Sequence, residues 1–277
     1  NAQAASGATG LFVLLFSQQA ASSQATAQIP SFAGLVALLG PLLGIAFGFD
    51  AINGERAERT LPRLVAQPIH RDDVINGKFA AGLALIGLVL LAITLLVSGV
   101  ALLVLGIRPS PDDLARVAIW FLVTLIYLGF WLAFAMLCSV VLRRAATSAL
   151  AAMSVWIVLT LFTGLLVGIM AGYLAPVPSG ATTDQQIANA ELQQQLARVS
   201  PGELYNEATV YLLNPTVQTL GIAQEVQQQN EQRAIPTALP LDQSLLLGVP
   251  QVVALLALTV LCFGLTYVVF MRQEVRA

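Results

Sequence analysis

The sequence predicts an all-α polytopic membrane protein with five visible transmembrane helices and a small helical extracytoplasmic insert. Three properties of the composition carry this prediction. Hydrophobic residues make up 57% of the 277 residues and charged residues only 10%, and the mean hydropathy is +0.79. Soluble domains are about one quarter charged, so the surface of this chain is not suited to water.

Five uncharged apolar runs are each long enough to cross a bilayer, which takes about 20 helical residues. They are 32–49, 79–107, 117–142, 145–175 and 244–271. None alternates with the period of two that a membrane β-strand requires. An earlier stretch, 11–16, is too short to span and is typical of an interfacial or re-entrant piece within an outer segment 1–31.

The distribution of Lys and Arg predicts the orientation in the cell membrane. With residues 50–78 inside, nine basic residues face the cytoplasm: Arg56, Arg59, Arg63, Arg71, Lys78, Arg143, Arg144, Arg272 and Arg276. Four face outward: Arg108, Arg116, Arg198 and Arg233. The C-terminus is therefore expected to be cytoplasmic. Five spans that end inside must begin outside, so we expect an upstream segment with a sixth span and a cytoplasmic start before residue 1.

Three glycines at four-residue spacing mark the first visible span, namely Gly40, Gly44 and Gly48. This spacing places them on one helix face, where they allow a second helix to approach closely. We interpret the face as a helix-packing or dimer face. The alternative is that the glycines face lipid and only loosen the helix. Pro41, beside the first glycine, can kink this helix.

Short turns separate the next spans. The segment 108–113 carries a Pro pair and then Asp112 and Asp113, which is typical of a turn followed by a helix start. Arg143 and Arg144 form a minimal turn between the third and fourth spans. Residues 32–175 are therefore expected to form one transmembrane bundle that includes the loop 50–78.

The insert 176–242 is polar and rich in Gln, and it precedes the last helix and tail, 243–277. We expect it to contain two to four helices. The first is predicted to begin at 182–184, with Leu192, Leu196 and Val199 on one face. The second is predicted by a capping box from Ser200 to Glu203, with Pro201 at the first helical position. A third is predicted after Asn214 and Pro215, with Val217, Leu220 and Val226 on one side. The insert could seal or shape an exit, dock a partner, or serve as a spacer.

Catalytic signals are missing from the chain. The central thirds of the five spans carry no ionisable residue, which argues against a proton relay or an intramembrane hydrolase. No phosphate-binding loop of the form GxxxxGK[ST] occurs, and His70 is the only histidine. Cys138 and Cys262 lie in apolar runs as small hydrophobic residues. We therefore expect no catalytic residue, no metal site and no cofactor on this chain, and any energy must come from a partner.

The loop 50–78 concentrates the charge of the chain. Residues 50–59 are expected to continue the first span as a helix, with Glu55 and Arg59 paired at i,i+4. Thr60 is a candidate N-cap for a short second helix that Pro68 ends. Asp72 or Asp73 then begins the next span, as the helix dipole prefers. Because acids and bases are mixed here, a protein partner is favoured over a purely lipid surface.

The stretch FDAINGERAERTLPRLVAQPIHRDDVINGKF resembles the signature of type-2 ABC exporter permeases. The matching residues are Phe49, Asp50, Ile52, Gly54, Glu55, Arg56, Thr60, Leu61, Leu64, Pro68, Arg71, Gly77 and Lys78. Three positions depart from the pattern: Arg59 stands where the family tends to have Gly, Pro62 is unusual, and His70 replaces a common Ser. The triplet Leu213-Asn-Pro215 is also similar to the branch that contains the permease linked to copper-site maturation of nitrous oxide reductase.

The resemblance implies a six-span permease that works as a homo- or heterodimer. Each half would contact one cytoplasmic ABC ATPase subunit, which would hold the ATP and Mg. The loop would include the coupling helix, and its coupling residues would be Asp50, Gly54, Glu55, Arg56, Glu58, Arg59, Thr60, Leu61, Leu64, Pro68 and Arg71. Membrane lipid is a further expected partner, and nucleic acid is not.

Three functions are compatible with these observations. The first is ATP-driven export of an apolar or amphipathic cargo, which the lack of charge within the spans favours. The second is a mechanotransmitting scaffold that acts on an extracytoplasmic protein docked to 176–242, without moving cargo. The third is a membrane anchor independent of any ATPase, in which the charged loop is only a solvated face.

Overall fold

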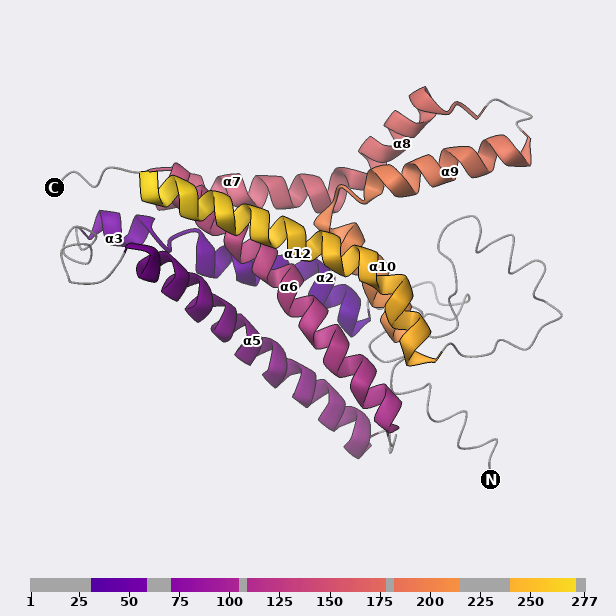
Figure 1. Cartoon of the computed structure of the whole chain (residues 1–277), viewed down its shortest axis with the longest axis horizontal. Coiled ribbons are helices and arrows are strands. Elements are labelled where there is room, and N and C mark those ends of the chain that lie inside the picture. Colours follow the sequence, from indigo (N-terminus) through magenta and orange to yellow (C-terminus); the bar gives the residue numbers. More distant parts are fainter. Residues whose placement is uncertain (1–30, 59–70, 105–108, 178–181, 215–239, 273–277) are drawn as a thin grey trace. The chain divides into compact units, whose positions relative to one another are not determined.

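A computed structural model describes residues 31–58, 71–104, 109–177, 182–214 and 240–272, and every regular element in these ranges is a helix (Figure 1). Five helical segments in the described ranges are long and apolar enough to cross a membrane: Phe32–Ala57, Asp72–Val100, Pro111–Val141, Ala145–Leu174 and Leu241–Arg272. Each contains or overlaps one predicted apolar run. The predicted all-α polytopic architecture is therefore confirmed.

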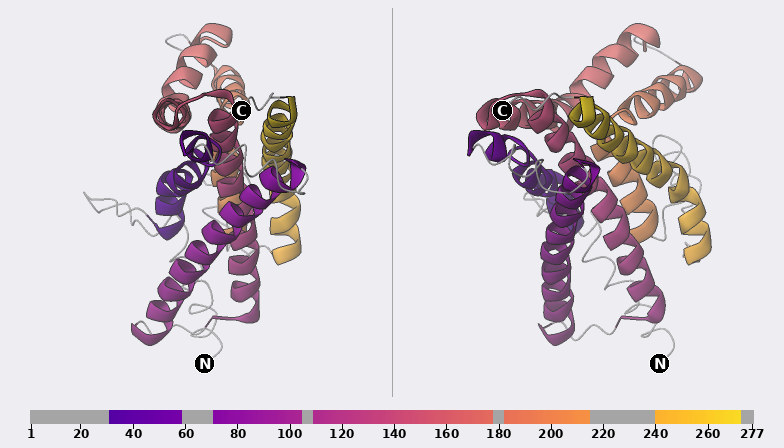
Figure 2. Two further views of the ribbon diagram at one scale, coloured as in Figure 1. Left: turned by 90° about the vertical axis from the view of Figure 1, so that its left-hand side faces the viewer. Right: turned by 60° about the vertical axis from the view of Figure 1, so that its left-hand side comes forward.

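The long helices have the following bounds: α2 (Phe32–Gly48), α5 (Arg71–Val104), α6 (Pro111–Val141) and α12 (Leu241–Arg272). The fourth span consists of α7 (Ala145–Ile157), a π-helical turn η1 (Val158–Phe162) and α8 (Thr163–Leu174). Three shorter helices complete the described fold: α3 (Asn53–Ala57), α9 (Thr183–Ala197) and α10 (Pro201–Leu213). Two further views show the same ribbon (Figure 2).

The chain forms two compact units. The bundle unit consists of Leu35–Ile107, Phe121–Trp156 and Val253–Ala277. The insert unit consists of Asn1–Gly34, Arg108–Trp120 and Ile157–Val252. Each unit has its own type of packing, and the two are described separately.

Close glycine contacts with α6 characterise the bundle unit. A Cβ atom built on Gly44 would lie 2.8 Å from the Leu128 carbonyl oxygen and 2.9 Å from the Leu132 amide nitrogen. One built on Gly48 would lie 2.8 Å from the Leu132 carbonyl oxygen. Only glycine permits this approach of two backbones, as in membrane helix pairs with small residues at the interface. The glycine face is therefore occupied by α6 of the same chain.

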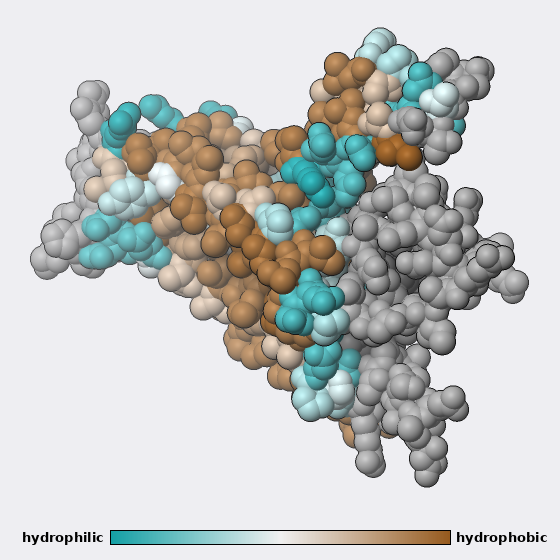
Figure 3. Space-filling model, turned by 45° about the vertical axis from the view of Figure 1, so that its right-hand side comes forward, coloured by the Kyte–Doolittle hydropathy of each residue, from teal (hydrophilic) through white to brown (hydrophobic). Residues whose placement is uncertain are grey.

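The helix α6 is the most enclosed of the five spans. About 61% of its apolar window is buried, against 17–33% for the others. Its buried side chains in the bundle unit include Tyr127, Trp131 and Met136. The other spans leave many large apolar side chains exposed, and brown hydrophobic surface covers much of the long helices in Figure 3. Such a surface suits a lipid environment rather than water.

Local sequence explains where α6 begins. The Ser110 hydroxyl accepts a hydrogen bond from the Asp113 amide at 3.1 Å, and the Ser110 amide donates to the Asp113 carboxylate at 2.9 Å. Pro111 occupies the first helical position. This reciprocal cap satisfies two orphan amides, and the Asp pair interacts favourably with the helix dipole. The helix start predicted at this Asp pair is present.

The fourth span is interrupted by η1, which the sequence reading did not predict. The π-helical turn runs from Val158 to Phe162. The Leu159 carbonyl oxygen accepts hydrogen bonds from the Thr163 hydroxyl at 2.6 Å and from the Ser200 hydroxyl at 3.0 Å. A π-turn displaces backbone groups from the regular helical ladder, and two hydroxyl groups bond to this carbonyl.

Two helices of the insert, α9 and α10, agree with the predicted helix signals at Thr182 and Ser200. Two details of the prediction are wrong. Ser200 makes no capping box with Glu203, because its hydroxyl donates to Leu159 instead. Val199 does not share a covered face with Leu192 and Leu196, since it follows the end of α9 and is 75% exposed.

Several predictions lie outside the described residues. They are the short apolar piece at 11–16, the second loop helix beginning at Thr60, and the helix after Pro215.

Candidate functional site: the α3 element and the Glu207 network

The described start of the predicted coupling loop is a turn followed by α3. The chain turns through residues 49–52, where the Ala51 amide donates to the Gly48 carbonyl at 3.2 Å and the Gly54 amide to the Asp50 carbonyl at 2.9 Å. The predicted helical continuation over 50–59 is therefore wrong at its start, where the chain turns, whereas Asn53–Ala57 is helical and Arg59 lies outside the described residues. The turn makes α3 a separate element of five residues.

Ser139, near the end of α6, holds the beginning of α3. Its hydroxyl oxygen accepts hydrogen bonds from the Ile52 amide at 3.1 Å and from the Asn53 amide at 3.2 Å. Both of these residues are buried. The first amides of a helix have no partner within the helix, so the hydroxyl acts as a cap supplied by another helix.

Arg56 also joins α3 to the same end of α6. Its guanidinium donates to the Val140 carbonyl at 3.3 Å from both terminal nitrogens, and more weakly to the Ser139 carbonyl at 3.5 Å. These carbonyls belong to the last turn of α6, which ends at Val141. A cation at a helix C-terminus compensates the negative end of the dipole, so this motif residue stabilises a junction within the chain.

Glu55 connects α3 to α5. Its carboxylate lies 2.6 Å from the Lys78 ammonium, and both side chains are only partly exposed. The predicted partner of Glu55, Arg59, lies outside the described residues. Among the described residues, Glu55 pairs with Lys78, which belongs to the Gly-Lys part of the same motif.

The remaining predicted coupling residues fall into two groups. Asp50 and Glu58 are exposed, and a Cβ atom on Gly54 would lie 2.9 Å from the Asp50 carboxylate. Arg71 begins α5. Arg59, Thr60, Leu61, Leu64 and Pro68 lie outside the described residues.

The insert unit contains a buried polar network around Glu207 of α10. Glu207 is only 8% exposed. Its carboxylate accepts two hydrogen bonds from Arg198 Nε at 3.0 and 3.2 Å, one from Gln194 at 3.1 Å and one from Gln251 at 2.9 Å. A buried carboxylate is tolerated when its oxygens are satisfied in this way. The network joins α9, α10 and α12.

Arg116 of α6 forms a second buried node in the insert unit. It is 2% exposed. Its guanidinium pairs with Asp112 at 2.9 Å and donates to the Leu212 carbonyl at 3.0 Å and the Ser244 hydroxyl at 3.2 Å. The Leu212 carbonyl belongs to the last turn of α10, which ends at Leu213. The guanidinium therefore caps α10 while it contacts the start of α12.

The surroundings of Glu207 shift two neighbouring pKa values. Burial raises the pKa of the Glu203 carboxyl, and the negative charge of Glu207 raises it further. Burial also raises the pKa of the Tyr211 hydroxyl, again with a contribution from Glu207. Both effects follow from the cost of forming a negative charge away from water and beside a like charge.

A cleft of about 360 Å³ opens beside the network. Its lining includes Thr163, Gly164 and Val167 of α8, Gln193 and Gln194 of α9, and Glu203 and Glu207 of α10. Among the described residues, no group of three or more His, Cys, Asp or Glu side chains could hold a metal ion. The lining of the cleft combines polar and apolar side chains.

Sequence reasoning missed Ser139, Glu207 and Arg116 as organising residues. Ser139 is a lone hydroxyl within an apolar run, and the three donors to Glu207 are separated in sequence by 9, 13 and 44 residues. A polar residue placed near the end of a membrane helix was the available signal for Ser139.

Comparison with known proteins gives one family. The model described as "ABC-2 family transporter protein" matches residues 1–275. A search of curated proteins found no match to this chain.

Proposed function

This chain belongs to the ABC-2 family of transporter proteins, and we propose that it is the permease subunit of an ATP-driven exporter. As a family member it is a multi-pass membrane component of an ABC transporter, not itself the ATPase. It works with a cytoplasmic ABC ATPase and often with a second permease. ATP and Mg are held by that ATPase subunit, and this chain supplies the path and the mechanical connection.

The observation that carries the proposal is the three-way attachment of α3. Ser139 and Arg56 fix α3 to the end of α6, and Glu55 fixes it to the start of α5 through Lys78. Only the short turn 49–52 separates α3 from α2. A force applied to the loop that follows α3 therefore acts on the ends of three long helices together, as coupling to a moving ATPase requires.

This assignment divides the motif residues by role. Glu55 and Arg56 point into the junction and transmit movement, whereas Asp50 and Glu58 are exposed and available to the ATPase. Leu61 and Leu64 supply the apolar contact that docks in the ATPase groove. The excess of Lys and Arg in the segments 50–78, 143–144 and 272–276 supports a cytoplasmic position for the loop and for the C-terminus.

The cargo is apolar or amphipathic. Charged side chains are absent from the central parts of the spans, so a path through the spans has no charged side chain that could bind an ionic cargo. The working unit is a dimer, in which the contact between copies lies elsewhere than on the glycine face covered by α6.

Copurification with the cognate ABC ATPase tests this function. The Leu64→Asp permease should no longer copurify with the ATPase, because the substitution places a charge in the docking contact. Arg56→Ala should remain in the complex but lose the stimulation of ATPase activity by cargo, because α3 is no longer held to α6. Asp242→Asn, at the start of α12, serves as the control.

The proposal fails if both Leu64→Asp and Arg56→Ala retain the partner and its full cargo-stimulated ATPase activity. Stimulation of ATPase activity by cargo in vesicles that contain only the permease and the ATPase would favour export over a purely mechanical role.

A second function is favoured by the Glu207 network. This network gives the insert unit a polar core of its own, as a docking platform requires and a spacer does not. In this alternative the ATPase drives movement of an extracytoplasmic protein bound to 176–242. ATPase activity that responds to such a protein but not to amphipathic cargo would favour this alternative. From the triplet Leu213-Asn-Pro215 alone, we also propose a relation to the permease branch linked to copper-site maturation of nitrous oxide reductase.

A further inference from the structure

Two threonine hydroxyl groups join α12 to α6 within the bundle unit. The Thr259 hydroxyl donates to the Ile126 carbonyl at 3.4 Å, and the Thr266 hydroxyl donates to the Ala133 carbonyl at 3.3 Å. Donor and acceptor are 133 positions apart in both bonds, so the two helices run in the same direction with one register. The threonines repeat with heptad spacing, as at the seam of a coiled coil. We call this contact the threonine seam.

Each of these threonines has a closer acceptor in its own helix. The Thr259 hydroxyl lies 2.8 Å from the Leu255 carbonyl oxygen, and the Thr266 hydroxyl lies 2.8 Å from the Cys262 carbonyl oxygen. Bonds between oxygens are most often about 2.7–2.8 Å long, so the bonds within α12 are the stronger ones. Both threonines are buried. If α12 moved away from α6, each hydroxyl would keep an acceptor, and no buried polar group would be left unsatisfied.

The contact between α2 and α6 has the reverse property. A Cβ atom built on Gly44 or Gly48 would lie 2.8 Å from a carbonyl oxygen of α6, so the two backbones touch at the glycines. A shift of α2 along α6 would bring the side chain of another residue against this backbone, which would clash. The glycine contact therefore holds α2 and α6 in one position.

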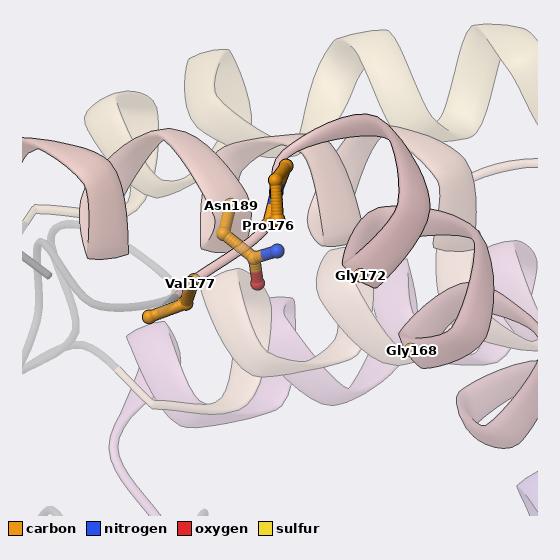
Figure 4. A pocket seen from close by; sticks show the side chains of 5 residues that line it. All are labelled: Gly168, Gly172, Pro176, Val177 and Asn189. Atoms are coloured by element: carbon orange, nitrogen blue, oxygen red, sulfur yellow. The ribbon is translucent and has the colours of Figure 1, made fainter. Parts of the chain in front are cut away.

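Glycine spacing alone does not produce such a contact. Gly168 and Gly172 of α8, in the insert unit, have the same spacing as Gly44 and Gly48, and they line a cleft beside Asn189 (Figure 4). A Cβ atom on either of them would meet nothing within 4 Å in the part of the chain that the structure describes. The nearness of the α6 backbone is therefore what fixes α2.

The helix α5 also belongs with α6. A Cβ atom on Gly82 would lie 3.0 Å from the Leu132 side chain. At the loop end, α3 bonds to α6 through Ser139 and to α5 through the pair of Glu55 and Lys78. The helices α2, α3, α5 and α6 are thus joined by backbone contact, hydrogen bonds and an ion pair.

The contact of α12 with α5 is of a weaker kind. It joins the rings of Phe263 and Phe79, whose centroids lie 4.5 Å apart. Apolar ring contacts require no particular donor or acceptor, so they can shift and form again. Both of these contacts of α12 within the bundle unit can therefore be released at low cost.

We propose that α2, α3, α5 and α6 move as one group in the transport cycle, and that the bundle opens at the threonine seam between α6 and α12. The inference rests on the proposed function, because the ATPase supplies the movement through the loop that follows α3. Opening at this seam leaves two hydroxyls that are already bonded within α12, which is the condition that hydrocarbon imposes on polar groups.

Disulfide trapping in the complex of the full chain with its ATPase tests the proposal. The native cysteines are first removed by Cys138→Ala and Cys262→Ala. Gly129→Cys with Thr259→Cys then forms the seam pair, since a Cβ atom on Gly129 would lie 3.9 Å from Thr259 Cγ2. This separation suits a disulfide, in which the two Cβ atoms lie about 3.5–4.5 Å apart.

The matched control pair lies within the moving group. It is Gly82→Cys with Leu132→Cys, where a Cβ atom on Gly82 would lie 3.6 Å from Leu132 Cγ. Like the seam pair, it changes one glycine and joins α6 to a neighbouring helix. Mass spectrometry of digested protein measures the rate of disulfide formation under a mild oxidant. The rates are compared in the nucleotide-free complex and in the complex trapped with ATP, Mg²⁺ and vanadate.

The expected result is a severalfold difference between the two states in the rate at the seam pair, and no difference at the control pair. The reason is that opening separates the two seam cysteines, whereas the control cysteines stay together. If Gly129→Cys prevents folding, Ala133→Cys with Thr266→Cys tests the same seam one heptad further along, without loss of a glycine.

Three outcomes overturn the inference. Equal rates at the seam pair in both states, in a complex that retains the ATPase, would show that the seam stays closed and would leave the proposed function in place. A change at the control pair as large as that at the seam pair would show that α5 and α6 do not move together. Failure of the chain with its native cysteines to bind the ATPase would overturn the proposed function, and this inference with it.

Discussion

The bundle unit and the insert unit hold their helices together by opposite means. In the bundle unit, Gly44 and Gly48 bring two backbones into direct contact. In the insert unit, Glu207 gathers Arg198, Gln194 and Gln251 from separate helices. One region depends on the absence of side-chain atoms and the other on the presence of a charge.

This difference follows from the environment of each region. Within hydrocarbon, apolar side chains gain little by leaving lipid, so close van der Waals packing of small residues associates helices. Where water reaches the protein, burial of a carboxylate is tolerated only with a full set of donors. The two units should therefore fail under different substitutions, and this expectation can be tested.

The largest effect is expected from Glu207→Leu. The substitution removes the acceptor of three donors, and we expect a loss of about 3 kcal/mol of stability. The melting temperature in detergent, followed by size-exclusion chromatography, measures the change. Glu191→Leu removes an exposed acid from the neighbouring helix α9 and should have little effect. Equal melting temperatures for the two variants would show that Glu207 does not hold α9, α10 and α12 together.

A methyl group added to the glycine face should cost about 2 kcal/mol. In Gly44→Ala the new atom meets backbone of α6, which cannot move aside. Gly40→Ala should cost less, because its nearest neighbour is the flexible end of the Leu128 side chain. Gly99→Ala, with nothing within 4 Å, is the matched control. The close contact with α6 is contradicted if the Gly44→Ala and Gly99→Ala variants have the same melting temperature.

The α3 junction belongs to the bundle unit but is held by hydrogen bonds and an ion pair, and it should be less sensitive to substitution. Arg56→Ala removes donors to the Val140 and Ser139 carbonyls, whose distances of 3.3–3.5 Å indicate weak bonds. We expect a cost of about 1 kcal/mol, measured by the same melting assay. Glu58→Ala, at an exposed neighbouring position, should leave the melting temperature unchanged. A larger loss for Glu58→Ala than for Arg56→Ala would reverse their assigned roles.

The smallest effect is a pH dependence confined to the insert unit. Because burial and Glu207 raise the pKa of Glu203 in the folded state, the folded chain binds more protons than the unfolded chain between the two pKa values. Stability therefore falls as pH rises from about 4.5, the ordinary pKa of Glu, through the raised folded pKa, and is level above it. Glu203→Gln should flatten this part of the melting temperature profile. A steeper profile in the variant would contradict the sign.

Sequence patterns predicted the fold well because long apolar runs and their caps are local signals. The runs, the Asp112–Asp113 helix start and the starts of α9 and α10 all required only neighbouring residues. The π-turn η1 and the roles of Ser139, Glu207 and Arg116 could not be predicted. They depend on contacts between helices distant in sequence, such as Arg116 with Ser244.

The motif of residues 49–78 could be recognised from the sequence as a whole, but the different roles of its residues could not be predicted. The pattern gave no means to separate Glu55 and Arg56, which bond within the chain, from the exposed Glu58. That separation came only from the partners supplied by α5 and α6.

The central claim, that the ATPase docks beside α3, is tested most directly by photo-crosslinking in the purified complex. A photoreactive benzoylphenylalanine is placed at Glu58, which is exposed, or at Leu114, which is exposed near the other end of α6. The account predicts a covalent adduct with the mass of permease plus ATPase from position 58 and none from position 114. An adduct from position 114, or none from position 58 while the complex remains intact, would contradict it.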